Sequence, residues 1–471
     1  MAKPKFFVIF AKKIVSNTKN QNSEHFLRQT HFDRRTVRSL FFGYVFIALL
    51  GAFLLRLDGV SKEPISFTDS LFTSASAVSM TGLIVKNTAL DFTLAGQAII
   101  LFLVQIGGLG YMGFGVFFYV LIRKKIGFNE RNMLKESLLY PHMEGIIGFL
   151  KHILFFVFIT EFVGGVLLSL RFALDMPILE ALWAGFFHSI SAFNNSGFST
   201  FELGLMAYRG DIFVNLIITS LIIIGGIGYF VLLELYLFRK KRIVNLSVHT
   251  KIILWGTAIL LACATFAVFW FEYSRGLEGL SLGDKLISSY FTAVNYRTSG
   301  FNTLDLGTFR DASLFFGSLF MVIGGGVGGT SGGVKITTVA VLLIYTYWII
   351  KNGRIRIFNH EIPAQTIRKA FVIAVGSMTY VIFCVVLLCL IEENFRFIEV
   401  FFETTSAFAT VGYSVGNGED LSLSAMFGAP AKFIIIVLMI SGRIGVFAFL
   451  VTIFGKEKEK YLKYPKGRIY L

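Results

Sequence analysis

The chain has 471 residues, of which 55% are hydrophobic and 15% are charged, and its formal net charge is +15. Soluble domains are about a quarter charged, so this composition excludes an ordinary soluble protein. The apolar residues form long blocks between short polar stretches, which excludes a disordered chain. The basic residues gather at the edges of these blocks, which argues against a nucleic-acid partner. We therefore expect an all-α integral membrane protein in contact with lipid.

Eight apolar stretches are long enough to cross a hydrocarbon core of about 30 Å, which takes about 20 helical residues. They lie at 39–57, 94–122, 149–172, 212–238, 250–272, 312–350, 366–391 and 428–454. Each successive pair encloses a shorter apolar segment, which predicts a re-entrant half-helix because it is too short to cross. The four half-helices are expected at 67–78, 178–193, 282–295 and 397–409.

Charge predicts the orientation of the chain. The two tails and the linkers 123–151, 239–251 and 351–369 carry 31 of the 44 Lys and Arg residues. By the positive-inside rule these segments face the cytoplasm, so both termini are expected there and the half-helices open toward the outside. The N-terminal tail lacks an apolar segment followed by a small-residue cleavage site, so no removable signal peptide is expected.

Two landmarks recur four times in the same order. A turn ending in glycine follows each half-helix, and an Ile-Gly-Gly or Ile-Ser-Gly sequence follows 25 to 30 residues later. The turn glycines are separated by 115, 103 and 112 residues. This predicts four tandem repeats of span, half-helix, turn and span around one pseudo-fourfold pore. The expected segments are a tail at 1–38, repeats at 39–122, 149–238, 250–350 and 366–454, and a tail at 455–471.

The four turns are the candidate ion-binding site. Non-helical backbone at membrane depth is tolerated only when it is buried in protein or lines a water-filled cavity. Glycine at positive φ lets carbonyl oxygens face an axis, where they replace the hydration shell of an alkali cation. Tight helix packing is the alternative explanation for any single glycine, but four in register favour a selectivity filter. The candidate residues are Ser79, Met80, Thr81, Gly82, Asn194, Asn195, Ser196, Gly197, Arg297, Thr298, Ser299, Gly300, Ala409, Thr410, Val411 and Gly412.

A glycine-rich segment at 324–333 interrupts the last span of the third repeat. A phosphate-binding loop is rejected, because Val334 separates Lys335 from the glycines and Ile336 follows. Glycines in mid-span predict an unwound segment that faces the cavity, and we interpret it as an intramembrane gate, with a packing loop as the alternative. The candidate gate residues are Gly324, Gly325, Gly326, Gly328, Gly329, Thr330, Ser331, Gly332, Gly333, Lys335 and Arg443.

Three charged or titratable residues have competing explanations. Lys335 either snorkels to the interface or stabilises the carbonyls of the loop. An arginine within a span costs at least about 2.5 kcal/mol, so Arg443 indicates function. It either places a charge barrier in the cavity or pairs with a carboxylate such as Glu161 or Glu234. His188 is expected as a hydrogen-bonded packing residue. No catalytic motif is found, so an enzyme is not expected.

The four turns and the segment 328–335 resemble the Trk/Ktr/HKT superfamily of cation transporters over residues 36 to 455. Within it, the chain is similar to the membrane subunit of a bacterial Ktr potassium-uptake system, because its polar tail leaves no room for the two extra N-terminal spans of Trk-type subunits. The resemblance implies potassium uptake across the bacterial cytoplasmic (inner) membrane, with a filter at the four turn glycines and a gate at 324–333. Met80, Ser196 and Ser299 depart from the usual pattern of the turns.

The same resemblance implies partners. Similar subunits form homodimers on a cytosolic ring of KtrA-type nucleotide-binding regulatory subunits, and ATP and ADP bind to that ring only. K+ is the transported ion, and no cofactor is expected on this chain. A sodium-translocating member of the same superfamily is the alternative, and sodium as a coupling ion is left open.

Overall fold

The computed structural model describes residues 34–110, 113–114, 127, 131, 146–241, 243–416, 421–445 and 448–449. Within these ranges the regular elements are helices and one two-stranded hairpin, β1 (Arg356–Ile357) with β2 (His360–Glu361). The predicted tails 1–38 and 455–471 lie outside the described residues, except that the first described helix already begins at Arg34.

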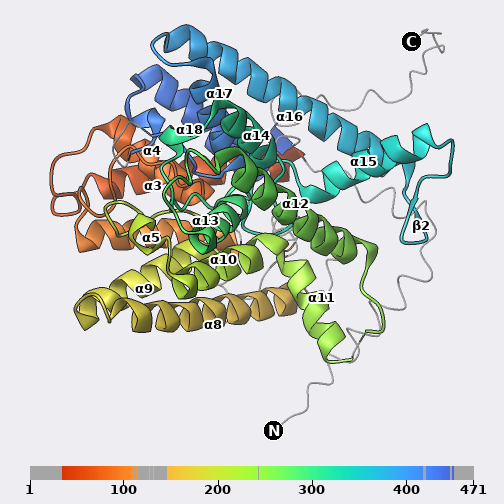
Figure 1. Cartoon of the computed structure of the whole chain (residues 1–471), viewed down its shortest axis with the longest axis horizontal. Coiled ribbons are helices and arrows are strands. Elements are labelled where there is room, and N and C mark those ends of the chain that lie inside the picture. Colours follow the sequence, from red (N-terminus) through yellow and green to blue (C-terminus); the bar gives the residue numbers. More distant parts are fainter. Residues whose placement is uncertain are drawn as a thin grey trace.

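Four long helices begin the four predicted repeats. Their length and apolar composition are sufficient to cross a membrane. In Figure 1, α8 and α16 run along opposite edges of the molecule and α12 lies between them. The four helices are α3 (Arg34–Leu55), α8 (Ile146–Phe172), α12 (Val248–Glu272) and α16 (Ala364–Ile391).

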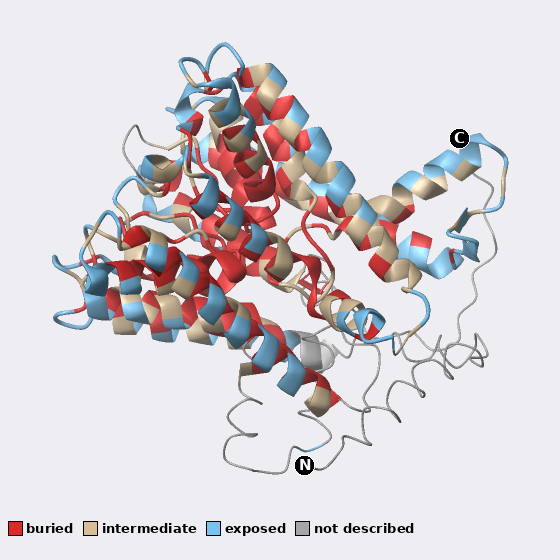
Figure 2. Cartoon of the chain, turned by 60° about the horizontal axis from the view of Figure 1, so that its bottom comes forward, coloured by how far each residue is buried: buried red, intermediate tan, exposed pale blue. Residues whose placement is uncertain are grey.

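Four short helices occupy the interior. They agree with the predicted half-helices to within one residue, so these elements are confirmed as helices. Serine begins two of them, because the side chains of Ser66 and Ser281 accept the backbone N–H groups of Asp69 and Asp284. Figure 2 shows that the buried residues concentrate in this central region. The helices are α4 (Phe67–Ser79), α9 (Ile178–Phe193), α13 (Leu282–Asn295) and α17 (Phe397–Ala409).

The second helix of every repeat is shorter than the apolar stretch that contains it. A break was expected in 312–350 only, and the prediction of unbroken helices over 94–122, 212–238 and 428–454 is wrong. The helices end at a glycine with φ of +71°, +105° and +95°, namely Gly110, Gly228 and Gly445. The elements are α5 (Leu94–Leu109), α10 (Ile212–Ile227), α11 (Tyr229–Arg239), α14 (Asp311–Val322), α15 (Ile336–Ile350) and α18 (Ala429–Ile444).

Glycine in the left-handed region is a common way to end a helix, and this explains the breaks. At Gly228 the chain turns by 99° between α10 and α11. Four described helices, or five if α10 and α11 count as one broken span, meet the requirements of a crossing helix. The expected total of eight crossings therefore stays a prediction for the remaining stretches.

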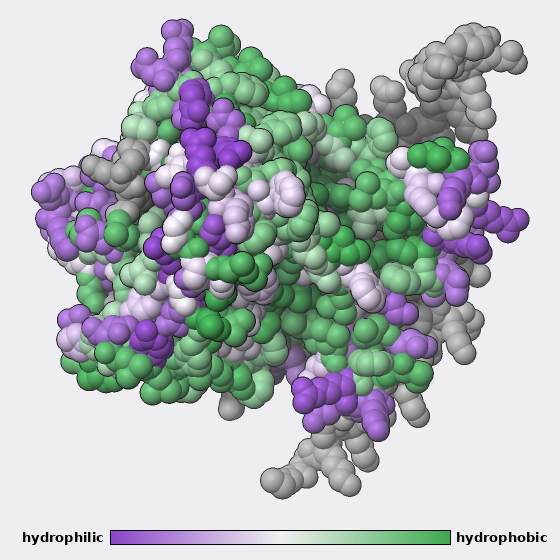
Figure 3. All heavy atoms as spheres, in the orientation of Figure 1, coloured by the Kyte–Doolittle hydropathy of each residue, from purple (hydrophilic) through white to green (hydrophobic). Residues whose placement is uncertain are grey.

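The surface has the character expected next to lipid. Figure 3 shows hydrophobic residues over most of the visible middle of the molecule, with hydrophilic residues at the loops on the left and at the ends of α11 and α15. Large apolar side chains are exposed on the long helices, for example Phe46, Phe155, Trp270 and Phe383. Such broad apolar exposure would make a water-soluble protein aggregate, so it supports a membrane location.

A serine of the short helix anchors it to the long helix of its own repeat. The Ser189 hydroxyl donates to the carbonyl of Glu161 at 2.7 Å. Gly164 lies one turn further along α8, and a Cβ there would stand 2.5 Å from Ser189 Oγ and 2.9 Å from Leu221. The absence of a side chain at Gly164 is therefore what lets α9 approach α8. Repeat 1 has the same arrangement at Ser74, Ala48 and Gly51.

We expect Gly164→Ala to destabilise the protein by about 1–3 kcal/mol, because the added methyl displaces Ser189 from its hydrogen bond. The matched control is Gly148→Ala on the same helix, where a Cβ would meet nothing within 4 Å. Thermal unfolding of the purified protein in detergent measures both. Gly→Ala by itself raises helix propensity, so the control is expected to keep or gain stability. A loss of stability in the control as large as that in Gly164→Ala would contradict the role of this contact.

Candidate ion pathway

The four turn glycines form a closed ring. A Cβ built on Gly82 would lie 3.3 Å from the Cα of Gly197, and one on Gly197 would lie 3.1 Å from the Cα of Gly300. One on Gly300 would lie 3.0 Å from the Cα of Gly412, and one on Gly412 would lie 3.0 Å from the Cα of Gly82. The structure thus brings together turns that are more than 100 residues apart in sequence.

Backbone carbonyls occupy the space that side chains would need. The Cβ positions of the four glycines fall 2.2–2.6 Å from a carbonyl oxygen of the next turn. These oxygens belong to the residues just before the glycines, namely Thr81, Ser196, Ser299 and Val411. A small cavity of about 70 Å³ adjoins the ring and is lined by the four glycines and the residues that follow them. Four carbonyls at equivalent positions are the ligand type that alkali cations prefer.

Each turn also contains a residue with positive φ two positions before its glycine, which the sequence did not predict. Left-handed backbone at a non-glycine residue costs about 1–3 kcal/mol and persists where the surrounding structure enforces it, commonly at ligand sites. The same strained conformation in four copies indicates one common role for the four turns. The residues and their φ angles are Met80 (58°), Asn195 (56°), Thr298 (81°) and Thr410 (53°).

Two of the side chains that depart from the usual pattern, Met80 and Ser196, contact the helices that flank the ring. A Cβ on Gly107 of α5 would lie 3.3 Å from Met80 Cγ, so the long methionine side chain fits where α5 has none. The Ser196 hydroxyl is 2.9 Å from that of Ser191 in the short helix α9. Asn195 donates to the Thr298 hydroxyl at 3.3 Å, which connects the second and third turns.

Arg297 belongs to the third turn but is buried, with 6% of the residue exposed. Its Nε and Nη2 atoms have no hydrogen-bond partner among the residues that the structure describes. These two nitrogens therefore make no described hydrogen bond to the carbonyl ring.

A buried carboxylate supports the second turn. Asn194 Nδ2 donates to Glu161 Oε1 at 2.9 Å and to Gln105 Oε1 at 3.0 Å, and Gln105 Nε2 donates to Glu161 Oε2 at 3.2 Å. Glu161 is 3% exposed, so these amides provide the hydrogen bonds that a buried carboxylate requires. The network joins α5 of the first repeat to the turn of the second. A lone glutamate within an apolar stretch was the only signal of it in the sequence.

Arg443 bonds to backbone carbonyls and not to a carboxylate. Its Nη1 donates to Thr330 O at 2.6 Å and its Nη2 donates to Gly107 O at 2.8 Å. Glu161 binds the amides described above, and Glu234 accepts from the backbone and hydroxyl of Ser247. The expectation that Arg443 pairs with one of these carboxylates is therefore wrong. Instead, Arg443 connects the glycine-rich loop to the end of α5.

The glycine-rich loop rests on the break between α10 and α11. Gly326 N donates to Gly226 O at 2.8 Å, and Tyr229 N donates to Gly328 O at 3.2 Å. On its other side the loop contacts the fourth turn, because a Cβ on Gly332 would lie 2.3 Å from Thr410 Oγ1. The loop therefore lies next to the ring and is hydrogen-bonded to a second repeat.

Lys335 stabilises the loop from within. Its ammonium group donates to Ser331 O and to Gly332 O, at 2.5 and 3.5 Å. Of the two explanations offered by the sequence, stabilisation of the loop carbonyls is the one that the contacts support. Lys335 also immediately precedes α15, so the loop and the helix after it are joined by this residue.

A ring of backbone carbonyls at the centre of an apolar helical protein is the arrangement of a cation-conducting membrane protein. The family described as TrkH, a cation transport protein, matches residues 7–464, and the chain belongs to this family.

Named relatives and a solved structure agree with this family. The chain is 40% identical to Ktr system potassium uptake protein B of Bacillus subtilis (strain 168) over 432 residues, covering 91% of this chain and 95% of the relative. It is 33% identical to potassium/sodium uptake protein NtpJ of Enterococcus hirae over 439 residues, covering 91% and 95%. The crystal structure of the potassium transporter TrkH from Vibrio parahaemolyticus superposes with a TM-score of 0.73 at 18% identity, covering 93% of this chain and 87% of that one.

We expect Glu161→Leu to destabilise the protein by about 1–3 kcal/mol, because it leaves the amides of Asn194 and Gln105 buried without their acceptor. Glu161→Gln keeps an oxygen that Asn194 can reach, so we expect a smaller loss. Thermal unfolding in detergent compares the two variants. Equal unfolding temperatures for Leu and Gln would contradict a supporting role for this hydrogen-bond network.

Proposed function

We propose that this chain takes up potassium across the cytoplasmic membrane through the carbonyl ring, which acts as its selectivity filter. The observation that carries the proposal is the closed order of the four turn glycines, with a carbonyl oxygen against each of them. The four short helices all end at this ring, so the partial negative charges of their C-termini favour a cation there. A relative that is 40% identical is named for potassium uptake.

A sodium-translocating function is the second candidate. It is favoured by the 33% identical relative that is named a potassium/sodium uptake protein. Backbone carbonyls coordinate either ion, and preference depends on the number and field strength of the oxygens in the ring. The same uptake experiment decides between the two, and it also tests whether sodium is a coupling ion.

We propose that the glycine-rich loop at 324–333 is an intramembrane gate and that Arg443 holds it closed. The loop lies against the fourth turn and is bonded to the end of α10 and to Arg443. These are contacts between separate repeats, so they can break without unfolding any helix. The charge of Arg443 also opposes the passage of cations, and a variant that keeps the charge separates the two effects.

We further propose that the chain is a homodimer of the bacterial inner membrane with both termini in the cytoplasm. Its regulatory partner is a cytosolic KtrA-type ring that binds ATP or ADP. The name of the 40% identical relative, a protein B of a Ktr system, supports a multi-component assembly. The basic sequence 239–242 begins with Arg239, the last residue of α11, and is suited to an acidic partner surface.

The test is rubidium uptake in cells that lack their own potassium uptake, with and without sodium, and with the chain alone or with a cytosolic nucleotide-binding partner. We expect rubidium uptake and potassium-dependent growth, with a higher rate when the partner is present. Gly300→Ser should lower the ratio of rubidium to sodium uptake roughly tenfold, because its side chain meets Val411 O.

The matched control for that variant is Gly279→Ser. Gly279 has nearly the same φ, +76° against +75°, but a Cβ there meets nothing within 4 Å. If Gly300→Ser inserts into the membrane and its ratio of rubidium to sodium uptake is unchanged, the selectivity filter does not lie at this position. Sodium uptake without rubidium uptake in the unmodified chain would favour the sodium-translocating alternative.

For the gate, we expect Arg443→Gln to raise the rubidium flux roughly threefold to tenfold, since it removes charge-assisted hydrogen bonds to the loop. Arg443→Lys keeps the charge but cannot reproduce the paired bonds to Thr330 and Gly107. A flux raised in both variants indicates that the bonds hold the loop, and a flux raised in the Gln variant only indicates a charge barrier. Unchanged flux in both would contradict the gate.

A further inference from the structure

The four short helices share one equivalent position at which the hydrogen bonding of the side chain alternates from repeat to repeat around the ring. The residue nine positions before each turn glycine is fully buried in the short helix, with 0% exposed. Its side chain makes hydrogen bonds within the described residues only in repeats 2 and 4, which lie opposite each other because the ring order is 82, 197, 300, 412. The four residues are Thr73, His188, Phe291 and Glu403.

Glu403 holds the segment that follows the fourth turn. Its Oε1 accepts from the backbone N–H of Ser424 at 3.0 Å and from the Ser424 hydroxyl. Ser424 lies in the short 3-10 helix η3 (Leu423–Ala425). Because a buried carboxylate without hydrogen bonds is costly, the carboxylate and this segment stabilise each other's position.

The segment held by Glu403 in turn holds two turns of the ring. Leu423 N donates to the Ser414 hydroxyl at 2.7 Å, and Ser414 is two residues after Gly412. Ser422 and Ile84 exchange two hydrogen bonds, both 2.9 Å long, and Ile84 is two residues after Gly82. Through three consecutive residues, Glu403 therefore supports the outer ends of the fourth and first turns.

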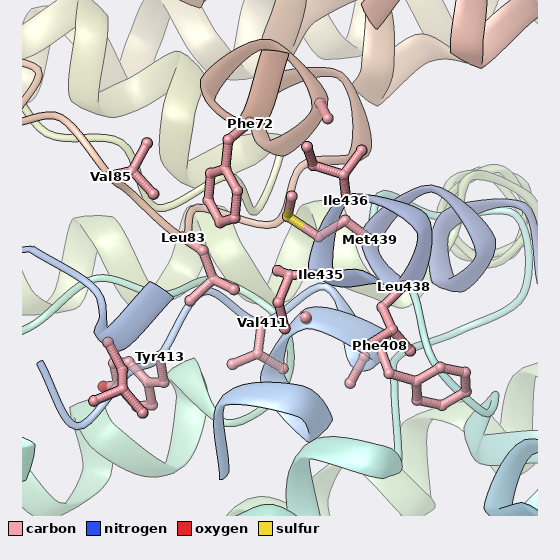
Figure 4. Close-up of a cluster of buried hydrophobic side chains, with 14 of the residues drawn as sticks. Phe72, Leu83, Val85, Phe408, Val411, Tyr413, Ile435, Ile436, Leu438 and Met439 are labelled. Carbon is pink, nitrogen blue, oxygen red and sulfur yellow. The ribbon is translucent and has the colours of Figure 1, made fainter. Parts of the chain in front are cut away.

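Apolar packing between the first and fourth repeats supports the same connection between their turns. Figure 4 shows Leu83 and Val85, which follow the first turn, within one cluster with Val411 and Tyr413 of the fourth. The cluster is apolar, so the two hydrogen bonds between Ser422 and Ile84 add directional contacts between these two repeats at the outer side of the ring.

His188 has the same role in the second repeat. Its Nδ1 is 2.7 Å from the carbonyl of Ala184 and must donate to it, so the neutral ring accepts at Nε2 from the Ser199 hydroxyl at 2.8 Å. Ser199 is two residues after Gly197, as Ser414 is after Gly412. The expected hydrogen-bonded packing role of His188 is thus confirmed.

The second repeat also supports its neighbour. Leu205 N donates to Asn302 O at 3.0 Å, and Asn302 is two residues after Gly300. The linkers of repeats 2 and 4 therefore each hold the turn of the next repeat in the ring.

We infer that Glu403 is a positioning residue that determines the ion preference of the ring by fixing the outer ends of the fourth and first turns, with His188 as its counterpart for the second turn. This rests on the proposed function, because it assumes that the ring is the filter. A ring of carbonyls without side-chain ligands selects ions through the spacing and number of its oxygens, so groups that restrict their movement affect selectivity.

The test measures the ratio of rubidium to sodium uptake in four variants. Glu403→Leu removes the carboxylate oxygen that accepts from Ser424, and Ser414→Ala removes the hydroxyl that accepts from the backbone N–H of Leu423 next to the fourth turn. We expect Glu403→Leu, which loses hydrogen bonds to a charged group, to lower the ratio roughly tenfold, and Ser414→Ala, which loses a neutral hydrogen bond, to lower it roughly fivefold. Glu403→Gln keeps an oxygen for Ser424 and should restore most of the ratio.

The matched control is Thr73→Val, at the equivalent position of the first repeat, where the hydroxyl has no hydrogen-bond partner within the described residues. We expect it to keep the ratio of the unmodified chain. A ratio in Glu403→Leu or Ser414→Ala equal to that of the control overturns the inference. If Glu403→Leu does not reach the membrane as folded protein, Ser414→Ala decides alone.

The proposed function and this inference fail in different ways. If the unmodified chain takes up no rubidium, the proposed function fails. If the unmodified chain takes up rubidium and Gly300→Ser lowers the ratio, but Ser414→Ala does not, then the filter stands and the positioning role of Glu403 is wrong. A low ratio in Glu403→Gln as well would assign the effect to the charge and not to the hydrogen bonds.

Discussion

The close approach of four glycines around one axis is the constraint on which the rest of the structure depends. At each glycine a carbonyl oxygen of the next turn lies where a Cβ would be, so no side chain is compatible with the ring. Four turns can meet this closely only if the helices that carry them end at the same place. The short helices α4, α9, α13 and α17 do so, and the long helices enclose them.

Such a ring requires support, because each turn contains a strained left-handed residue before its glycine. Much of that support comes from polar groups that are buried or partly buried. Glu161 binds the second turn through Asn194, and Glu403 binds the segment that follows the fourth turn. Lys432 of α18 pairs with Asp69 of α4 at 2.8 Å. Buried polar contacts of this kind are directional, so they specify position more strictly than apolar packing does.

The glycine-rich loop at 324–333 is also held by directional polar contacts, but these contacts serve a different purpose. Its carbonyls bind Arg443 and Lys335, and its N–H groups bind the end of α10. None of these contacts lies within a continuous helix, so the loop can change position without loss of helical hydrogen bonds. This is why a gate is chemically reasonable at 324–333, although the helices around it are fixed by packing.

Hydrophobic length and glycine placement are local properties, so the membrane class, the positions of the four short helices and the four glycines of the ring could all be predicted from the sequence. It did not reveal the helix breaks at Gly110, Gly228 and Gly445, since glycines within an apolar stretch also occur in unbroken helices. The partners of Arg443, Glu161 and Glu403 were decided by the tertiary structure alone. Each of them bonds to residues of another repeat or of a distant loop, and one sequence contains no information about which distant groups come within hydrogen-bond distance.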